Sequence, residues 1–448
     1  MTHNTKSWTE KTNSSAAPNS SGAQLGQQYI GQSMVFTSVE SLVEQLRPNI
    51  PVHCIRPQIL QETARWFLQN FPGDVLYAVK CNPEPVVLRY LSEAGIRHFD
   101  VASLTEVKLA ARYTNGGKIY FMHPVKSRQA IRESYFEYGV RDFSLDSAEE
   151  LQKIIEETGA ATDLNLHVRM ALPRGTAAHD LSGKFGAGVE LAAQLLQAVD
   201  KIAAKTGVCF HVGSQCMNPD SYRRALKTAG QVIAKSGVDI DALDVGGGFP
   251  ANYPGMTPPP LSRYMDAIKI GIEELNLSPK CQIWCEPGRA IVAEAGSLIV
   301  NVESRKGQSL YINDGIYGSL FDAGVLNTRY PTKLLRANGA SHRAPFKSFS
   351  FYGPTCDSVD VMKGPFLLPE DVVEGDWIEI GQLGAYCISM QSKFNGFDDY
   401  LIAEVWDQPL LRMPDWQPKT DRRIGRQDTV WNLNMIAWAR EAYEAQMN

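Results

Sequence analysis

The sequence predicts an α/β protein in which a (β/α)8 TIM-like barrel is joined to a C-terminal antiparallel β domain. Two observations predict the barrel: eight short runs rich in β-branched and aromatic residues alternate with amphipathic stretches, and nearly every run ends in a polar residue or a glycine. A third observation predicts the β domain, because the helical stretches stop after about residue 297. Strands alternating with helices are typical of parallel βα units, and strands separated only by turns are typical of antiparallel sheets.

The eight runs lie at residues 74–79, 97–102, 118–123, 141–146, 163–170, 207–213, 241–246 and 281–286. Between them, residues 84–95, 104–117 and 147–159 carry apolar side chains at the i, i+3, i+4 and i+7 spacing of a helix that packs on a core. Eight such units fit a closed parallel barrel better than an open sheet.

The ends of the runs carry a set of polar or special residues. They are Lys80, Asp100, His123, Asp146, Arg169, His211 with Ser214, Gly246 to Gly248, and Glu286. Active sites of such barrels are built at the C-terminal ends of the strands. A structural role explains any one of these residues, but eight together predict an active site.

Both ends of the chain have distinct patterns. Residues 1–30 are rich in Ser, Asn, Thr and Gly and bury too little apolar surface to offset their ordering entropy, so we expect a disordered polar tail. Residues 297–448 contain strand-like runs separated by Gly, Pro and Asp, and we expect them to form the β domain, closed by an amphipathic helix at about 430–446.

Composition excludes several classes of protein. The net charge of −5 gives no general attraction to nucleic acid or an anionic membrane. No window approaches the ~18 apolar residues of a membrane span, and the N-terminus lacks the apolar core of a signal peptide. The 8 cysteines show neither a disulfide framework nor zinc-site spacing. We therefore expect a cytoplasmic protein with free thiols and no metal.

Lys80 ends an apolar strand, where burial lowers the pKa of an amine and makes it a better nucleophile. An ion pair with a carboxylate at the rim is the alternative. Gly246 to Gly248 offer backbone N–H groups to a phosphate, although three glycines also suit a sharp loop, and their spacing fits neither a dinucleotide-binding motif nor a P-loop.

Two further groups carry candidate chemistry. Glu286 could hold a cation such as a protonated pyridine nitrogen, and Arg289 a phosphate or carboxylate; a structural ion pair is equally compatible. Cys356 and Asp357 combine a proton donor with a receptor for a cation, although an inert loop cysteine is the simpler interpretation of Cys356. His211 alone is more often a core residue than a catalytic one.

Taken together, these segments resemble the ornithine/lysine/diaminopimelate/arginine decarboxylases, pyridoxal-phosphate (PLP) enzymes of the alanine-racemase-like fold. The matching stretches are YAVKCN (77–82), FDVAS (99–103), KFG (184–186), FHVGS (210–214), LDVGGGFP (243–250), EPGR (286–289), NDGIYGS (313–319), YGPTCDSVD (352–360) and GAYCISMQSKFNGF (384–397). They follow the family order over most of the chain, and ornithine decarboxylases are the most similar.

The resemblance implies that residues 31–50 join the β domain and that residues 51–296 form the PLP-binding barrel. It also implies a head-to-tail homodimer with shared active sites. Lys80 would carry the cofactor as a Schiff base, His211 would stack on its ring, and Glu286 would pair with its nitrogen. The residues implied to surround the ring and hold the phosphate are Asp100, Arg169, Ser214, Gly246, Gly247, Gly248, Arg289 and Tyr386.

Cys356 and Asp357 are implied to enter from the partner subunit, with Cys356 donating a proton to Cα, Asp357 receiving the distal ammonium and Phe394 lining the pocket. This favours a diamino acid, with L-ornithine converted to putrescine in polyamine biosynthesis. One departure concerns the segment 320–331, where the family's second distal-amine Asp is replaced by Leu326. Asp322 is our candidate substitute, and lysine or another cationic amino acid is the alternative substrate.

Two other functions compete with this interpretation. An amino-acid racemase shares the barrel but is not expected to have the Cys-Asp loop or the FNGF segment. A catalytically inactive regulatory homologue would be expected to lack cofactor or substrate groups, yet Lys80, Glu286, Arg289, Cys356 and Asp357 are all present.

Overall fold

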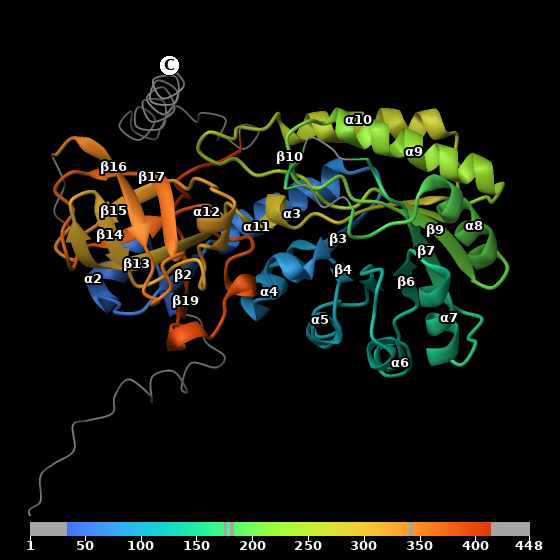
Figure 1. The fold of residues 1–448 in the computed structure, drawn as a ribbon, viewed down its shortest axis with the longest axis horizontal. Helices are drawn as coiled ribbons and strands as arrows, with labels where there is room; N and C mark the ends of the chain where they lie inside the picture. The colour runs from blue at the N-terminus through green and yellow to red at the C-terminus, as the bar shows by residue number, and fades with distance from the viewer. Residues whose placement is uncertain (1–33, 174–176, 180–182, 340–343, 414–448) are drawn as a thin grey trace, which may run out of the picture.

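The computed structural model describes residues 34–173, 177–179, 183–339 and 344–413. The expected tail at residues 1–30 and the expected helix at about 430–446 lie outside the described residues. Figure 1 shows a barrel and a β domain side by side, with α3 (Pro57–Asn70) and α11 (Arg289–Val292) between them.

The barrel is a closed ring of eight parallel strands in the order β11-β12-β3-β4-β5-β6-β7-β9. Its strands are β3 (Asp74–Ala78), β4 (His98–Val101), β5 (Ile119–Phe121), β6 (Asp142–Leu145), β7 (Asn165–Arg169), β9 (Lys205–Cys209), β11 (Ala242–Asp244) and β12 (Gln282–Cys285). Seven of the eight predicted runs contain one of these strands, and the run 207–213 overlaps β9 at residues 207–209, so the predicted fold class is confirmed. The ring closes where Trp284 and Cys285 of β12 pair with Asp74 and Val75 of β3.

Helices on the outside of the barrel bury one apolar face each. They are α4 (Pro85–Ala94), α5 (Leu104–Ala110), α6 (Arg128–Phe136), α7 (Ala148–Glu157), α8 (Val189–Asp200), α9 (Asp220–Ser236) and α10 (Leu261–Leu275), together with α3. The hydroxyls of Ser103, Ser127 and Ser147 accept backbone N–H groups of α5, α6 and α7, which begin directly after them. Side chains fill the barrel: the rings of Tyr120 on β5 and Trp284 on β12, which are not neighbouring strands, lie 4.8 Å apart.

The β domain is one nine-stranded sheet built from both ends of the described chain. Its strands are β1 (Met34–Phe36), β2 (Val52–Ile55), β13 (Gly296–Lys306), β14 (Ser309–Ile312), β15 (Thr332–Leu335), β16 (Phe346–Tyr352), β17 (Val361–Pro369), β18 (Trp377–Ile380) and β19 (Leu401–Val405). The path runs β1-β19-β2-β13-β14-β16-β17, and β18 joins β13 to β15. The short helix α2 (Val39–Leu46) packs on it through Val39, Leu42 and Val43.

The sheet differs from the predicted one in two respects. It is mixed rather than purely antiparallel, because β1 and β19, β19 and β2, and β14 and β16 are parallel pairs. Hairpins force antiparallel pairing, but β1 and β2 precede the whole barrel and reach the sheet without a hairpin to set their direction. In addition, β2 pairs with β13 and β19, so residues 52–55 lie in this sheet and not in the barrel to which 51–296 were assigned.

Among the described residues, none of the helices is both long and apolar enough to cross a membrane. In the same part of the chain, His, Cys, Asp and Glu side chains form no group of three or more that could hold a metal ion.

Candidate active site

The C-terminal ends of the barrel strands bring the predicted polar residues together. Lys80 lies in the 3-10 turn η1 (Val79–Cys81) directly after β3, and its Nζ donates to Asp100 Oδ2 at 2.5 Å. The Lys80 side chain is 39% exposed, so it can be reached from the barrel mouth.

The charge state of the free lysine differs from the sequence-based expectation. Burial lowers the pKa of Lys80, but the carboxylates of Asp100 and Glu286 raise it by more, so the pKa lies above its ordinary value. The predicted neutral amine is therefore wrong for the uncombined side chain, because the sequence does not place the two carboxylates around it. An ammonium held by Asp100 must lose its proton before Nζ can act as a nucleophile.

Glu286 follows β12 and is 4% exposed. Burial and the nearby carboxylates of Asp100 and Asp244 raise the pKa of Glu286 well above its ordinary value. Its Oε1 has no hydrogen-bond partner among the described residues. A buried carboxylate surrounded by like charges is stabilised by a cation placed against it, which fits the protonated nitrogen of a pyridine ring.

The glycine run follows β11 and is pressed against the neighbouring loops. A Cβ on Gly246, whose φ is +69°, would lie 2.0 Å from Phe210 O. A Cβ on Gly247 would lie 2.5 Å from Glu286 O and 3.0 Å from His211 Nε2. Only glycine allows this backbone to approach so closely, and its exposed N–H groups suit an anion.

His211 lies beside this loop as a neutral ring. Its Nδ1 accepts the Gly213 N–H at 3.0 Å, which leaves the proton on Nε2. Burial and the positive charges of Arg169 and Lys80 lower its pKa well below the ordinary value. A neutral imidazole suits stacking on an aromatic cofactor, because it adds no charge to the ring.

Arg289 opens α11 and is 5% exposed. Its Nη1 donates to Tyr253 OH at 2.9 Å, and its Nη2 lies 3.5 Å from Ser214 Oγ. The guanidinium lies 4.8 Å from the centroid of the Tyr386 ring. Its Nε is buried without a partner among the described residues, so the group retains a donor for a phosphate.

These features fit PLP, the cofactor implied by the resemblance. For this cofactor, Lys80 would provide a covalent anchor, Glu286 a counter-charge for the ring nitrogen, and Arg289 with the glycine run a place for the phosphate. The unpartnered oxygen of Glu286 and the unpartnered Nε of Arg289 are the observations that favour it, because buried polar atoms normally have partners.

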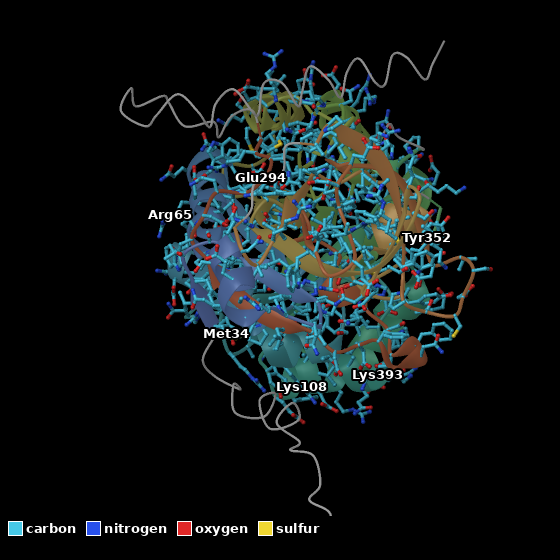
Figure 2. The ribbon with its side chains drawn as sticks, turned by 90° about the vertical axis from the view of Figure 1, so that its left-hand side faces the viewer. Met34, Arg65, Lys108, Glu294, Tyr352 and Lys393 are labelled. Atoms are coloured by element: carbon cyan, nitrogen blue, oxygen red, sulfur yellow. The ribbon has the colours of Figure 1, made fainter. Side chains whose placement is uncertain are left out.

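Cys356, Asp357 and Phe394 form a second cluster on the β domain. The Tyr317 hydroxyl donates to Asp357 Oδ2 at 2.5 Å, the Tyr317 and Phe394 rings lie 4.7 Å apart, and Cys356 N–H donates to Asn395 Oδ1 at 3.1 Å. In Figure 2, Tyr352, which lies shortly before Cys356 and Asp357, and Lys393, which directly precedes Phe394, are labelled on the same side of the molecule. Cys356 is exposed and Phe394 is 43% exposed.

Asp322 pairs with an arginine of the predicted site. Its Oδ2 is 3.2 Å from Arg289 Nη2, and it is buried. The carboxylate thus contacts the residue implied to hold the phosphate, and its role as a replacement for the missing Asp at Leu326 stays a prediction. Asp322 lies within α12 (Phe321–Val325), whereas Leu326 is exposed at the C-terminal end of the helix.

Three contributing residues were not singled out from the sequence. Tyr253 holds Arg289, Tyr317 holds Asp357, and Asp244 Oδ1 accepts the Gly246 N–H at 2.8 Å. Asp244 lies within the motif LDVGGGFP and Tyr317 within NDGIYGS, so their places in these motifs were a signal for both residues. Tyr253 gave no such signal, because only the fold brings it to Arg289.

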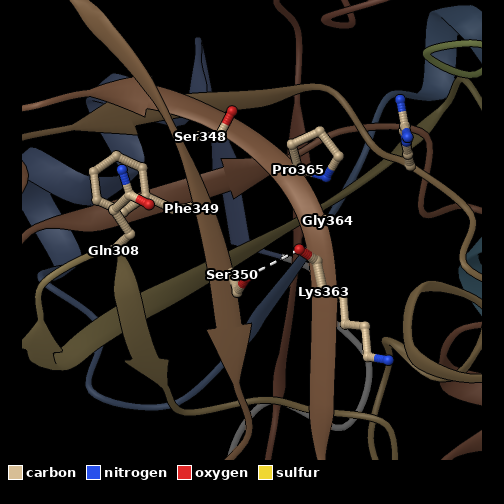
Figure 3. A pocket seen from close by; sticks show the side chains of 8 residues that line it. Gln308, Ser348, Phe349, Ser350, Lys363, Gly364 and Pro365 are labelled. Atoms are coloured by element: carbon tan, nitrogen blue, oxygen red, sulfur yellow. Dashed lines mark hydrogen bonds between the residues drawn. The ribbon is translucent and has the colours of Figure 1, made fainter. Parts of the chain in front are cut away.

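A separate hollow opens on the β domain beside β16 and β17 (Figure 3). It has a volume of about 340 Å³ and is lined by Gln308, Arg329, Ser348, Phe349, Ser350, Lys363, Gly364 and Pro365. None of the predicted site residues lines it, so it is distinct from the cluster at the barrel mouth.

Comparison with known proteins agrees with the geometry. Residues 56–293 match the family model described as the pyridoxal binding domain of pyridoxal-dependent decarboxylases. A lysine/ornithine decarboxylase of Selenomonas ruminantium is 32% identical over 407 residues, which cover 88% of this chain and 98% of the relative. Antizyme inhibitor 2 of Xenopus laevis is 32% identical over 362 residues, which cover 74% of this chain and 75% of the relative.

Among solved structures, the arginine decarboxylase of Paramecium bursaria Chlorella virus bound to agmatine superimposes with a TM-score of 0.72 at 27% identity. The match covers 82% of this chain and 99% of the viral enzyme. The described barrel and sheet thus correspond to an entire decarboxylase chain.

Proposed function

This chain belongs to the pyridoxal-dependent decarboxylases, as an amino-acid decarboxylase of the ornithine decarboxylase type that uses pyridoxal 5′-phosphate, and we propose that its substrate is L-ornithine. The products are putrescine and CO2, and the reaction serves polyamine biosynthesis. The observation that supports the proposal is the pairing of Asp357 with Tyr317, which lowers the pKa of the Asp357 carboxyl and so favours the charged form that would bind the distal ammonium of a diamino acid.

In this proposal each rim residue has one task toward the cofactor. Lys80 Nζ would hold it covalently, Glu286 would pair with its ring nitrogen, and His211 would stack on its ring. Ser214, Gly246, Gly247, Gly248, Arg289 and Tyr386 would hold its phosphate, with Asp100 and Arg169 in the surrounding network; Arg289 already contacts Ser214 and the Tyr386 ring. Bound pyridoxal phosphate supplies an electron sink for the electron pair left at Cα when the substrate loses CO2.

The protein's contribution to that step is electrostatic. The buried Glu286 carboxylate stabilises positive charge at the ring nitrogen, and the low local dielectric strengthens this interaction. The neutral His211 adds no competing charge. Cys356 Sγ then donates the proton that Cα requires after CO2 has left.

The Cys356 cluster supports a shared active site. Within one chain, Cys356, Asp357 and Phe394 lie on an exposed part of the β domain, joined to one another through Tyr317 and Asn395. In a head-to-tail homodimer this cluster completes the barrel mouth of the partner subunit. We place the enzyme in the cytoplasm, without nucleic-acid or membrane partners.

The substrate is tested by measuring kcat/KM for release of 14CO2 from ornithine, lysine, arginine and diaminopimelate. One methylene separates ornithine from lysine, and a pocket discriminates such a difference by about 10- to 200-fold. We expect ornithine to be favoured within that range. Equal values would identify a lysine/ornithine decarboxylase, and a reversal would overturn the ornithine assignment.

The role of Lys80 is tested in the purified protein. A covalently held cofactor absorbs at about 420 nm, and this band is expected to vanish in Lys80→Ala while the far-UV circular dichroism is retained. A band that persists in the variant would contradict the anchoring role.

The similarity to antizyme inhibitor 2 makes a regulatory homologue the alternative function. The retained Lys80, Glu286 and Cys356 favour the enzyme. Absence of 14CO2 release from all four substrates by cofactor-loaded protein would favour the regulatory alternative.

A further inference from the structure

Asp322 is buried against the guanidinium that we assign to the cofactor's phosphate. Its Oδ2 lies 3.2 Å from Arg289 Nη2, the same nitrogen that lies 3.5 Å from Ser214 Oγ. Both side chains are at most 7% exposed. The chain therefore places its own anion on the same guanidinium that is assigned to the phosphate, and next to Ser214.

Besides this carboxylate, two other residues support the orientation of Arg289. Tyr253 OH accepts from Nη1 at 2.9 Å, and the Tyr386 ring covers the guanidinium at 4.8 Å. Two contacts on different parts of the planar group already fix its position. The distinct contribution of Asp322 is thus its negative charge.

The carboxylate is also held in place by its own backbone. Asp322 O accepts the N–H groups of Leu326 at 3.2 Å and Thr328 at 3.0 Å, which anchors the residue within α12 and the turn that follows. It cannot move far from Arg289 without breaking these bonds.

We infer that Asp322 is an internal competitor for Arg289 that weakens phosphate binding and so sets the affinity of the enzyme for its cofactor. A cofactor phosphate carries nearly two negative charges, and a like charge that shares its guanidinium opposes binding. Because Arg289 is already neutralised, more of the phosphate's stabilisation must come from the glycine run and Ser214. The inference rests on the proposed assignment of Arg289 to the phosphate.

The test compares the affinities of two ligands, pyridoxal phosphate and pyridoxal, which lacks the phosphate. Dissociation constants are measured by absorbance titration of the cofactor-free protein. In Asp322→Asn we expect pyridoxal phosphate to bind about tenfold more tightly, while pyridoxal binding stays unchanged. Inorganic phosphate should compete with pyridoxal phosphate at a correspondingly lower concentration.

Matched variants separate charge from shape. Asp322→Glu keeps the charge and should remain close to wild type, whereas Asp322→Ser, a smaller neutral side chain, should reproduce the tightening even where Asp322→Asn fails to fold. Asp200→Asn removes one exposed carboxylate at the end of α8 and should change neither affinity.

Unchanged or weaker binding of pyridoxal phosphate in both neutral variants would overturn the inference. Loss of the folded state in both, seen by circular dichroism, would overturn it too, because the carboxylate would then be a structural necessity. Arg289→Gln identifies failure of the underlying assignment: if it does not weaken pyridoxal phosphate binding relative to pyridoxal, the phosphate lies elsewhere. In the Arg289→Gln background, the effect of Asp322→Asn should disappear.

Discussion

At the scale of single residues, the barrel mouth gathers charges of both signs in a small buried volume. Lys80 pairs with Asp100, and Arg289 pairs with Asp322, whereas Glu286 and Asp244 each keep one buried oxygen without a partner among the described residues. The ion pairs fix the positions of the side chains. Buried polar atoms without partners are unfavourable, and a ligand that bonds to them would offset that free-energy cost.

Glu286 provides a direct test of that distinction. Glu286→Gln keeps the size of the side chain but removes its charge, so the ring nitrogen would lose the partner that favours its protonated form. We expect pyridoxal phosphate to remain bound while kcat falls by about 100-fold or more, because a ring without this positive charge would be a poorer electron acceptor. Steady-state kinetics with the cofactor at saturation measure this.

A second outcome would contradict the role of Glu286. If kcat is retained and only the dissociation constant of the cofactor rises, the carboxylate contributes to binding and not to the electron sink. Asp200→Asn, an exposed change of the same charge, serves as the control and should leave kcat unchanged.

Tyr317 is expected to control the ionisation of Asp357. The Tyr317 hydroxyl and the Val359 N–H hold the pKa of Asp357 below its ordinary value, so the carboxylate stays charged above that pKa. Tyr317→Phe removes the first bond and raises this pKa. The acid limb of kcat/KM should therefore move to higher pH, and KM should rise roughly fivefold with little change in kcat.

The pH profile of kcat/KM for ornithine distinguishes this effect from a general loss of packing, since Phe retains the ring that contacts Phe394. Tyr311→Phe on β14, whose ring lies 5.0 Å from that of Tyr352, is the matched control and should leave the acid limb in place. An unmoved acid limb in Tyr317→Phe would show that Asp357 does not bind the substrate ammonium.

At the scale of elements, short segments after the strands carry the site. The turn after β3 carries Lys80, the glycine run after β11 touches His211 and Glu286, and α11 begins at Arg289. The strands behind them are buried and hydrogen-bonded on both sides, so each loop starts from a fixed point.

Gly247→Ala tests whether the close approach of the glycine run to Glu286 and His211 is needed for cofactor binding. The added Cβ would lie 2.5 Å from a backbone oxygen of Glu286, so the glycine run must shift away from the cofactor site. We expect pyridoxal phosphate affinity to fall by about tenfold or more, because the loop's N–H groups lose their alignment. Absorbance titration measures the change.

Gly188→Ala is the control for this variant. Gly188 precedes α8 with φ of −62°, and a Cβ there would meet nothing within 4 Å. We expect wild-type affinity in Gly188→Ala. Equal affinity in Gly247→Ala would mean that the glycine run does not contact the cofactor.

At the scale of the whole molecule, the proposed chemistry requires residues from the barrel and residues from the β domain. The barrel mouth carries Lys80, and the exposed β-domain cluster carries Cys356 and Asp357. A head-to-tail dimer would bring each cluster to the other subunit's barrel, so neither subunit would be active alone.

Mixing two inactive variants tests this arrangement. Lys80→Ala and Cys356→Ala dimers should each be nearly inactive, but random exchange makes half of the dimers mixed, each with one intact site. We therefore expect about one quarter of wild-type activity after exchange. If subunit exchange is confirmed by mass spectrometry and no activity returns, the sites are not shared.

The sequence by itself determined the barrel, because eight apolar runs with intervening amphipathic helices have few other ways to bury their surfaces, and each run became a strand. It also determined which residues lie at the rim, since a residue that follows a parallel strand must lie at that end. The ordered motifs indicated the family before any distance was known.

Only the tertiary structure decided how those residues interact. The sign of the Lys80 pKa shift depends on Asp100 and Glu286, which lie 20 and 206 positions away in the chain. Asp322 pairs with Arg289, a contact that the sequence did not predict. A local sequence pattern likewise could not predict the parallel pairing of β19 with β1 and β2, because that pairing joins the two ends of the described chain. Local periodicity records which face of an element is buried, whereas charge pairing and strand direction depend on neighbours that only the fold supplies.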